Sequence, residues 1–514
     1  MEVLAKPFGD EDRTGPEMWI DEAIWGHRLH DEQTPWLTLL EFLCVLHAEN
    51  GQARALTEAR VNELSYRPQT QLRLRNLLFN NPHITTVLSS DQSDETMWST
   101  WQTLMTEHAG GLDRPDFTYL RDRFETFQDF VSVVSFLQSS AIEGGSNKRW
   151  SSKFVFPFGT SALYEDVSVT ATGVATDRRF FARTGEVLYL MLCRSQRVNE
   201  LRERLGRRIL NVDAPYDGLI RALQGDVQLA RQERAGAFLP CMSHPTFDRL
   251  AEDWIAILDL QIPAYDAIPH IVTMTGLHLI LYQLQRASEV LALDETITMV
   301  CEIVSPKRSV VRDLSADSFQ GNNALPQQAL ERFIREIADT PEWRTALQSD
   351  EPGLNAAELL SKTFDWPDLD DPDEAQGLPE QLLEELVRRG LVRHKQHVGK
   401  VHATWARMIG LSSRRASRRV RYAPTDRLLK TLVVCCVDRR IEFKDFLVLL
   451  RDRYGLVIGD QQARRFIDVG AADQEDFSDN ARRLEERLAS LGLLKRLSDS
   501  CAYVENPFQR SAQP

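Results

Sequence analysis

Side chains able to bind phosphate are concentrated in residues 388–430. This segment contains thirteen Lys or Arg residues and one acid, Asp426, so its local charge is 13 − 1 = +12, whereas the whole chain carries −14. Clustered arginines bind nucleic acid because they displace the counterions condensed on its phosphates. We therefore expect this segment to bind double-stranded DNA. The candidate contacts are Arg388, Arg389, Arg393, Lys395, Lys400, Arg407, Arg414, Arg415, Arg418, Arg419 and Arg421.

An acidic segment precedes the basic one. Residues 365–385 hold nine Asp or Glu residues and no Lys or Arg, and Pro367, Pro372, Gly377 and Pro379 interrupt them. This composition is typical of a solvated linker or loop. Two alternatives to DNA therefore stay open. The basic segment could pair with these acids, or the protein could be an adaptor or scaffold whose basic segment grips an acidic partner protein.

A catalytic alternative comes from Glu442-Phe443-Lys444, with Asp426 or Asp438 upstream. Metal-dependent nucleases use such carboxylates to hold a divalent ion and a nearby lysine beside the attacking water. That pattern normally lies on strands, whereas residues 443–454 have the periodicity of a helix. A degenerate nuclease is therefore the less favoured alternative. We expect no catalytic residue, although the sequence leaves the question of an enzyme open.

Metal and cofactor motifs are weak in this sequence. His394, His397 and His402 match no known ligand spacing, and the surrounding lysines oppose a cation, so we expect neutral or phosphate-facing imidazoles. Cys241-x-x-His244 has no second pair nearby. The G-x-x-x-x-G-K-[ST], G-x-S-x-G and H-E-x-x-H motifs do not occur. We expect no metal and no other cofactor.

A second basic region mixes cations with aromatic residues. Lys148, Arg149 and Lys153 alternate with Trp150 and a Phe-rich run up to residue 158, and three further arginines follow at positions 178, 179 and 183. Such a mixture can hold a phosphate and stack on a base. The favoured interpretation is that the aromatic residues anchor a loop and that the arginines pair with nearby acids.

The elements that would position the basic segment resemble winged-helix modules. Helical periodicity is found at residues 425–436, 443–454 and 460–467, and in a fourth helix that starts at Asp479 or Asn480 and ends at Gly492. Strands at 493–497 and 501–504 would form the terminal hairpin. A similar ending occurs 102 residues earlier. There a helix ending at Gly390 would be followed by strands at 391–395 and 400–404.

The whole chain has 514 residues, which is long enough for several domains. We predict a mainly α, multidomain protein with a small β insertion in the middle and winged-helix-like modules in the C-terminal part. The expected segments are a helical domain (1–140), a helical domain with a small β or irregular insertion (141–310), a first winged-helix-like module with the acidic linker (311–410), and a C-terminal winged-helix domain (411–514).

The cysteines and the most apolar stretch of the sequence indicate the cellular compartment. The seven cysteines form no C-x-x-C pair, which favours reduced thiols in a cytosolic protein. The most apolar stretch, residues 270–284, contains two histidines and is too short to span a bilayer. We expect a cytoplasmic protein without membrane contact.

Three stretches of sequence carry a resemblance: Lys148-Arg149-Trp150-Ser151-Ser152-Lys153-Phe154-Val155-Phe156-Pro157-Phe158-Gly159, Arg183-Thr184-Gly185-Glu186-Val187-Leu188-Tyr189, and the ending at residues 487–507. They resemble an uncharacterised component of bacterial methylation-associated antiphage defence systems. The resemblance implies a role beside DNA methyltransferase, kinase or ATPase components, and it carries over no site residue. Combined with the charge pattern, it predicts a non-catalytic, DNA-associated component of a defence complex.

Overall fold

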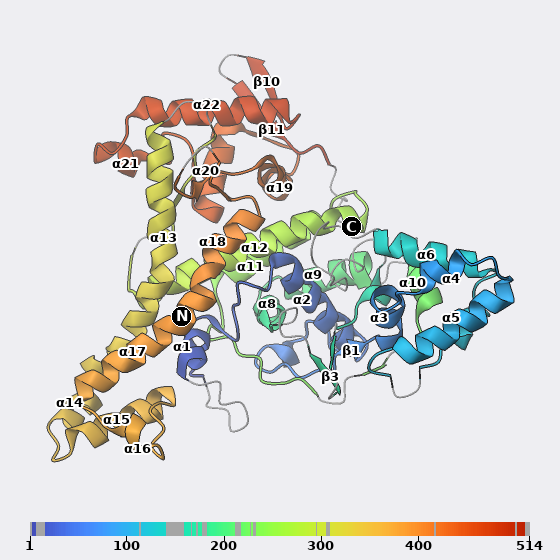
Figure 1. The fold of residues 1–514 in the computed structure, drawn as a ribbon. Coiled ribbons are helices and arrows are strands. Elements are labelled where there is room, and N and C mark those ends of the chain that lie inside the picture. Colours follow the sequence, from blue (N-terminus) through green and yellow to red (C-terminus); the bar gives the residue numbers. More distant parts are fainter. Residues whose placement is uncertain are drawn as a thin grey trace. The chain divides into compact units, whose positions relative to one another are not determined.

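The computed structural model describes residues 3–6, 16–112, 115–139, 159–165, 167–170, 173–176, 182–210, 217–226, 228–229, 233–294, 296–304, 309–415, 418–498 and 501–508. Helix accounts for 62% and strand for 7%, which confirms a mainly helical protein with small sheets (Figure 1). The chain forms two compact units. Unit 1 comprises Met1–Pro35, Arg194–Arg197 and Phe238–Pro514, and unit 2 comprises Trp36–Cys193 and Val198–Ala237. The division into four segments stays a prediction.

Unit 1 is built mainly from long helices. In chain order they are α1 (Pro16–Trp25), α11 (Pro245–Leu258), α12 (Ala264–Val290), α13 (Val310–Arg335), α14 (Pro341–Leu347), α15 (Pro352–Phe364), α16 (Pro372–Ala375), α17 (Pro379–Gln396), α18 (Val398–Met408), α19 (Asp426–Cys436), α20 (Phe443–Tyr454), α21 (Arg464–Asp468) and α22 (Gln474–Ser490).

Helix α12 is the core helix of unit 1. It packs against α11, α13 and α18, and it has 27 residues, so it is longer than the apolar stretch seen in the sequence. Among the described residues it is the one helix long and apolar enough to cross a membrane, but 89% of its apolar window is buried inside the protein. The Nε2 group of Gln283 donates to the carbonyl of Val398 at 2.8 Å, which ties α12 to the start of α18.

Helices α17 and α18 run end to end beside α13 (Figure 1). Leu382 and Leu386 are buried on the inner face of α17. Gly390 lies on the same face, where an added Cβ would be 3.3 Å from side-chain atoms of Leu330 and Ile334 on α13. Gly390 therefore allows two helices to approach closely, and it does not end a helix.

The predicted first hairpin is wrong. Residues 391–395 lie in α17, and residues 400–404 lie in α18. Leucine and glycine at matching spacing do not by themselves separate a helix end from a tightly packed helix interior. The repeat of the C-terminal ending is therefore not a structural repeat.

The predicted C-terminal hairpin is confirmed. Strands β10 (Leu494–Ser498) and β11 (Cys501–Glu505) pair antiparallel, and β11 also pairs with β8 (Arg440–Glu442), which gives the sheet order β10-β11-β8. Gly492, just beyond α22, has φ +71°, as expected for a residue past a helix end. Residues 499–500, which connect the two strands, lie outside the described residues.

Residue Asn480 has a different role from the predicted helix cap. Helix α22 begins at Gln474, and Asn480 is buried within it. The Asn480 side chain accepts from the backbone N–H of Ile303 at 2.8 Å and donates to the carbonyls of Cys301 and Ile458. This amide therefore joins three separate segments. The nearby strands β5 (Met299–Val300) and β9 (Leu456–Val457) pair in parallel.

Unit 2 contains shorter elements. They are α2 (Pro35–Asn50), β1 (Gln69–Thr70), α3 (Leu72–Phe79), α4 (Ile84–Leu88), α5 (Asp94–His108), α6 (Phe127–Ser139), β2 (Val167–Thr170), β3 (Gly173–Thr176), α8 (Thr184–Cys193), α9 (Val198–Leu205), α10 (Asp217–Leu223) and β4 (Gln228–Leu229), with short 3-10 helices at Glu58–Arg60, Thr118–Leu120 and Thr160–Ala162 and a π-helix at Gly206–Leu210.

An aromatic cluster forms one core of unit 2. Trp98 and Trp101 of α5 pack on Phe127 and Phe130 of α6, with ring centroids 4.8–6.1 Å apart. These rings are fully buried, and α6 begins at Phe127. The small β insertion is confirmed as the antiparallel pair β2–β3. The basic, aromatic stretch at 148–158 lies outside the described residues.

Candidate nucleic-acid interface

The most cationic feature of unit 1 is a short hairpin, which we call the arginine hairpin and define as residues 412–422. Its strands β6 (Ser412–Ser413) and β7 (Arg421–Tyr422) pair antiparallel. The loop between them carries Arg414, Arg415, Arg418 and Arg419. The first three are exposed, and none of them forms an ion pair with a carboxylate in the described part of the chain. The hairpin therefore presents several unneutralised guanidinium groups to solvent.

The base of the arginine hairpin is held by buried charge. Arg421 is fully buried, and its Nε group donates to Glu302, which is also fully buried. The other carboxylate oxygen of Glu302 accepts from Nε of Arg312 on α13 at 2.8 Å. Arg421 also donates to the backbone carbonyl of Arg415 at 3.0 Å, so it fixes the loop from inside. Arg421 supports the hairpin and is not accessible to a phosphate.

A second buried link fixes strand β7. The hydroxyl of Tyr422 lies 2.7 Å from Nε2 of His402 on α18 and accepts from the side-chain amide of Asn322 on α13 at 2.9 Å. Burial lowers the pKa of His402 to about 3, so this imidazole is neutral at pH 7. The backbone carbonyl of Tyr422 accepts from Ser315 at 2.8 Å. The hairpin thus rests on two long helices.

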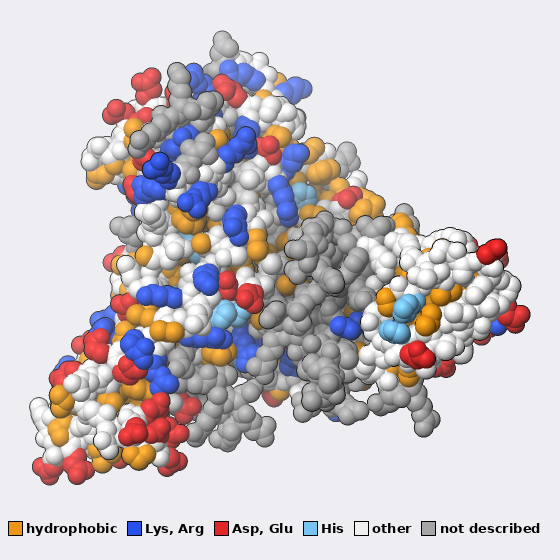
Figure 2. All heavy atoms as spheres, in the orientation of Figure 1, with side chains coloured by type: hydrophobic (Ala, Val, Ile, Leu, Met, Phe, Trp, Pro, Cys, Tyr) orange, Lys and Arg blue, Asp and Glu red, His pale blue; other side chains and the backbone are white. Residues whose placement is uncertain are grey.

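Helices α17 and α18 add further cations. Lys395, Lys400 and Arg407 are exposed, and none of the described carboxylates pairs with them. Arg393 is partly buried and donates to Gln396 and to the sulfur of Met18. Basic side chains gather on the face of unit 1 that carries these helices and the C-terminal elements (Figure 2).

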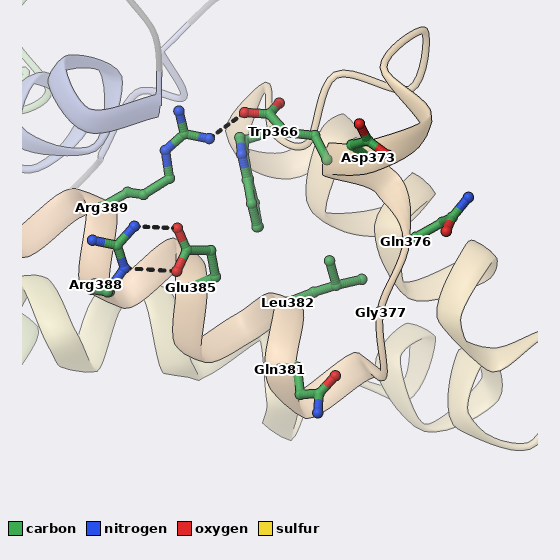
Figure 3. A pocket seen from close by; sticks show the side chains of 10 residues that line it. Trp366, Asp373, Gln376, Gly377, Gln381, Leu382, Glu385, Arg388 and Arg389 are labelled. Carbon is green, nitrogen blue, oxygen red and sulfur yellow. Dashed lines mark hydrogen bonds and ion pairs between the residues drawn. The ribbon is translucent and has the colours of Figure 1, made fainter.

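Three of the predicted DNA contacts form ion pairs with carboxylates of the same chain. Arg388 forms a bidentate pair with Glu385, Arg389 pairs with Glu374, and Arg419 pairs with Asp317. The first two pairs border a pocket of about 480 Å³ between α16 and α17 (Figure 3). The acidic segment therefore neutralises the start of the basic one, as one of the sequence alternatives predicted.

The C-terminal helices present mixed charge. Arg482 pairs with Asp479 on the surface of α22, and Arg487 pairs with Asp426 of α19. The first turn of α22 carries Glu475 and Asp476 and is not basic. An acidic helix start repels the phosphates that line a DNA groove. Among the described elements, the arginine hairpin and α18 match DNA electrostatically better than α22 does.

In the described part of the chain, the nuclease-like acids Glu442, Asp426 and Asp438 belong to no cluster of three potential metal ligands. Glu442 is exposed on β8, whereas Asp426 pairs with Arg487. The carboxylates of Glu442 and Asp426 thus have separate surroundings.

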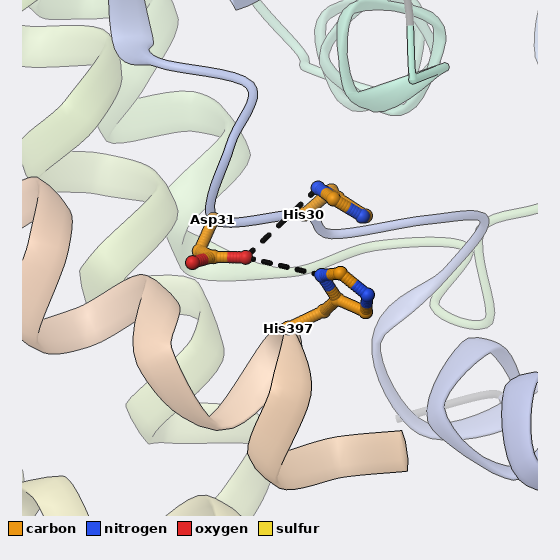
Figure 4. Close-up of side chains that lie close together, drawn as sticks. All are labelled: His30, Asp31 and His397. Atoms are coloured by element: carbon orange, nitrogen blue, oxygen red, sulfur yellow. Dashed lines mark hydrogen bonds and ion pairs between the residues drawn. The ribbon is translucent and has the colours of Figure 1, made fainter. Parts of the chain in front are cut away.

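The histidines singled out in the sequence separate in the structure. Nδ1 of His394 lies 2.8 Å from Asp21, and His402 belongs to the hairpin support. His397 instead meets His30 and Asp31 from the loop between α1 and α2 (Figure 4). The two imidazoles stack with centroids 3.9 Å apart, and burial together with His397 lowers the pKa of His30 to about 4.

Unit 2 contains a buried charge network, in which Arg183 pairs with a nearby acid, Glu186, as the sequence predicted, whereas the part played by Glu41 was not predicted. The carboxylate of Glu41 accepts from the backbone N–H groups of Arg183 and Gly185, at 3.1 and 2.7 Å, and so caps the start of α8. Glu186 accepts from Nε of Arg183 at 2.7 Å and from the hydroxyl of Tyr66 at 3.0 Å. A Cβ on Gly185 would lie 2.5 Å from Cβ of Glu41. These buried contacts therefore restrict which side chains fit at the start of the stretch 183–189.

Together, the fold and this surface define a mainly helical protein with a rigidly supported cationic hairpin. Residues 394–506 match the family model described as methylation-associated defense system protein MAD7. The matched segment runs from the end of α17 through the arginine hairpin to the last strand. The resemblance to a methylation-associated defence component is therefore confirmed. No curated protein matches the chain, and no solved structure does.

Proposed function

We propose that this protein is a non-catalytic, DNA-binding component of a bacterial antiphage defence complex. The arginine hairpin is its main phosphate contact, and Lys395, Lys400 and Arg407 extend the surface. The observation that supports this proposal is the set of exposed arginines held on a loop whose base is locked by buried ion pairs. A hairpin base that is fixed before binding limits the conformational entropy that is lost there on binding. Contacts to phosphate of this kind give affinity without sequence preference.

The C-terminal elements support a winged-helix module at residues 425–506. Helix α19, strand β8, helices α20 and α22, and the hairpin β10–β11 occur in the order of that fold, with β9 and α21 inserted between α20 and α22, and β11 lies between β10 and β8. In such a module α22 takes the position of the recognition helix. Because the first turn of α22 is acidic, we propose that this module docks onto a protein of the defence complex, such as a methyltransferase, kinase or ATPase component.

Charge reversal in the hairpin tests the proposed function. In the full chain, Arg414→Glu combined with Arg415→Glu should weaken binding to a fluorescein-labelled DNA duplex at least about tenfold, because two phosphate contacts become repulsive. Fluorescence anisotropy measures the affinity. Neither side chain is buried, so the variant should unfold at the same temperature as the wild type.

The matched control changes the same charge elsewhere. Arg332→Glu with Arg344→Glu alters two exposed arginines on α13 and α14, and it should change the affinity less than about twofold. Equal affinities of the hairpin variant and the wild type would overturn the proposal. So would a wild-type protein that binds no duplex at low salt.

A further inference from the structure

Three potential metal ligands meet where the break between α17 and α18 faces the loop between α1 and α2. Oδ1 of Asp31 lies 3.2 Å from Nδ1 of His397 and 3.9 Å from Nδ1 of His30. One donor atom from each residue can be chosen so that all three lie within 4.8 Å of one another. Both imidazole Nδ1 atoms face the same carboxylate oxygen (Figure 4).

These separations fit the donor atoms of one coordination shell. Zinc binds imidazole nitrogen and carboxylate oxygen at about 2.0–2.2 Å. Two such bonds at a tetrahedral angle place their donor atoms roughly 3.3–3.6 Å apart, a range set by those bond lengths. The distance between Asp31 and His397 is just below this range, and the distance to His30 exceeds it by a few tenths of an ångström. Small side-chain rotations would close that difference.

Two irregular parts of the backbone, a break between helices and a loop, bring these three ligands together. His397 has φ −131° and ψ −79°, so it interrupts an otherwise continuous helical path. His30 and Asp31 are adjacent in a loop of the same unit. The amide of Glu32 donates to Nδ1 of His30 over a long 3.3 Å, and a metal would displace this weak bond.

The three side chains are exposed by only 13–21%, so they form a shallow, half-buried site with one side toward solvent. Two imidazoles and one carboxylate suit borderline divalent transition ions rather than Mg²⁺ or Ca²⁺. Three protein ligands also leave a coordination position for water or a further ligand.

We propose that His30, Asp31 and His397 bind one divalent transition-metal ion, of the class to which Zn²⁺ belongs. His394 lies three positions before His397 in the sequence. It does not belong to this ligand set, because its side chain faces Asp21. The ion would tie the loop between α1 and α2 to the junction of α17 and α18. The proposal does not depend on DNA binding.

Zinc titration of the full chain, after chelator treatment and dialysis, tests this site. Isothermal titration calorimetry should show one ion bound tightly by the wild type. His397→Gln and Asp31→Asn should each weaken this binding at least about tenfold. Even the loss of a group that only hydrogen-bonds a metal ligand lowers metal affinity about 10–100-fold. Zn²⁺ should also raise the unfolding temperature of the wild type more than that of either variant. The metal-free variants should unfold close to the metal-free wild type.

The matched control removes a different imidazole pair. His83 and His108 of unit 2 are exposed, with their Nε2 atoms 3.3 Å apart, and could also bind zinc weakly. His83→Gln should leave the tighter binding intact. Three outcomes would overturn the proposal: no zinc binding by the wild type, equal binding by His397→Gln and Asp31→Asn, or loss of the tighter binding in His83→Gln alone.

Discussion

At the scale of single residues, burial separates arginines that the sequence cannot distinguish. Arg421 and Arg415 belong to the same basic run, but Arg421 is fully buried against Glu302 whereas Arg415 is exposed. A buried arginine needs a paired carboxylate because its desolvation is costly. One sequence signal for this pair was available. Glu302 is a single acid in the apolar run from Met299 to Ile303, and such an acid is seldom buried without a partner.

The titration of His402 gives a testable pH dependence. The pKa of His402 is lowered from its ordinary 6.5 to about 3 by burial. Between these values the unfolded chain binds a proton that the folded chain does not, so stability decreases as the pH falls. From pH 7 to 5, His402 should contribute a loss of about 2 kcal/mol in the free energy of unfolding. Urea unfolding at both pH values measures this loss.

The variant His402→Gln isolates this contribution. Its free energy of unfolding should decrease by about 2 kcal/mol less than that of the wild type between pH 7 and 5, because glutamine does not titrate. The exposed His108→Gln is the control and should keep the wild-type response. The same pH response in His402→Gln and the wild type would contradict a neutral, buried imidazole at this position.

At the scale of elements, the arginine hairpin depends on its buried base more than on its own strands. Each strand has only two residues, and two-stranded ribbons are marginal in water without further packing. Arg421 supplies that packing through Glu302 and through the carbonyl of Arg415. The hairpin is therefore stable only as part of unit 1.

Replacing Arg421 tests the support of the hairpin. Arg421→Leu should lower the free energy of unfolding by about 3–5 kcal/mol, because it leaves the buried Glu302 carboxylate with fewer partners. Arg414→Leu removes an exposed guanidinium and should change the free energy of unfolding by less than about 0.5 kcal/mol. Urea unfolding compares the two variants. Equal stabilities would show that the buried pair does not hold the hairpin.

The helix at residues 379–396 shows why one predicted element failed. Its buried residues Leu382, Leu386, Gly390 and His394 recur at every fourth position, so the helical period continues past the predicted helix end at Gly390. The prediction gave weight to Gly390 as a stop signal. Packing against α13 instead leaves little room for a side chain there, since an added Cβ would lie 3.3 Å from Leu330 and Ile334. Glycine thus has two structural uses, and only the neighbouring helix decides between them.

At the scale of the whole molecule, charge is divided sharply along the chain. Outside residues 388–430 the net charge is −14 − 12 = −26, so most of the protein repels DNA. Binding must then be confined to the local cationic surface, and it must weaken steeply with salt. Within residues 388–430, the exposed cations without a described acidic partner are Lys395, Lys400, Arg407, Arg414, Arg415, Arg418, Arg427 and Lys430.

Salt dependence tests this confinement. The logarithm of the binding constant for duplex DNA should fall linearly with the logarithm of salt concentration, with a slope no steeper than about −7 if all eight cations contribute about 0.9 each. Arg414→Ala with Arg415→Ala should make the slope less negative by about 2. An unchanged slope in this variant would place the phosphate contacts elsewhere on the protein.

The sequence by itself determined what depends on neighbouring residues. Helical periodicity gave the mainly α class, and turn residues marked the C-terminal hairpin. The count of charges located the basic segment. Three stretches of sequence indicated the defence family, which the match at residues 394–506 supports. Each of these properties depends on residues that lie close together in the sequence, so it can be predicted without the fold.

Only the tertiary structure decided which of those residues are available. Arg421 meets Glu302 across 119 positions, and His397 meets Asp31 across 366. Such pairings depend on how distant helices pack. The local sequence therefore contains neither the burial of a charge nor the partner that neutralises it. For this protein, packing against α13 buries one arginine of the basic run at the base of the hairpin, while its loop neighbours stay in solvent.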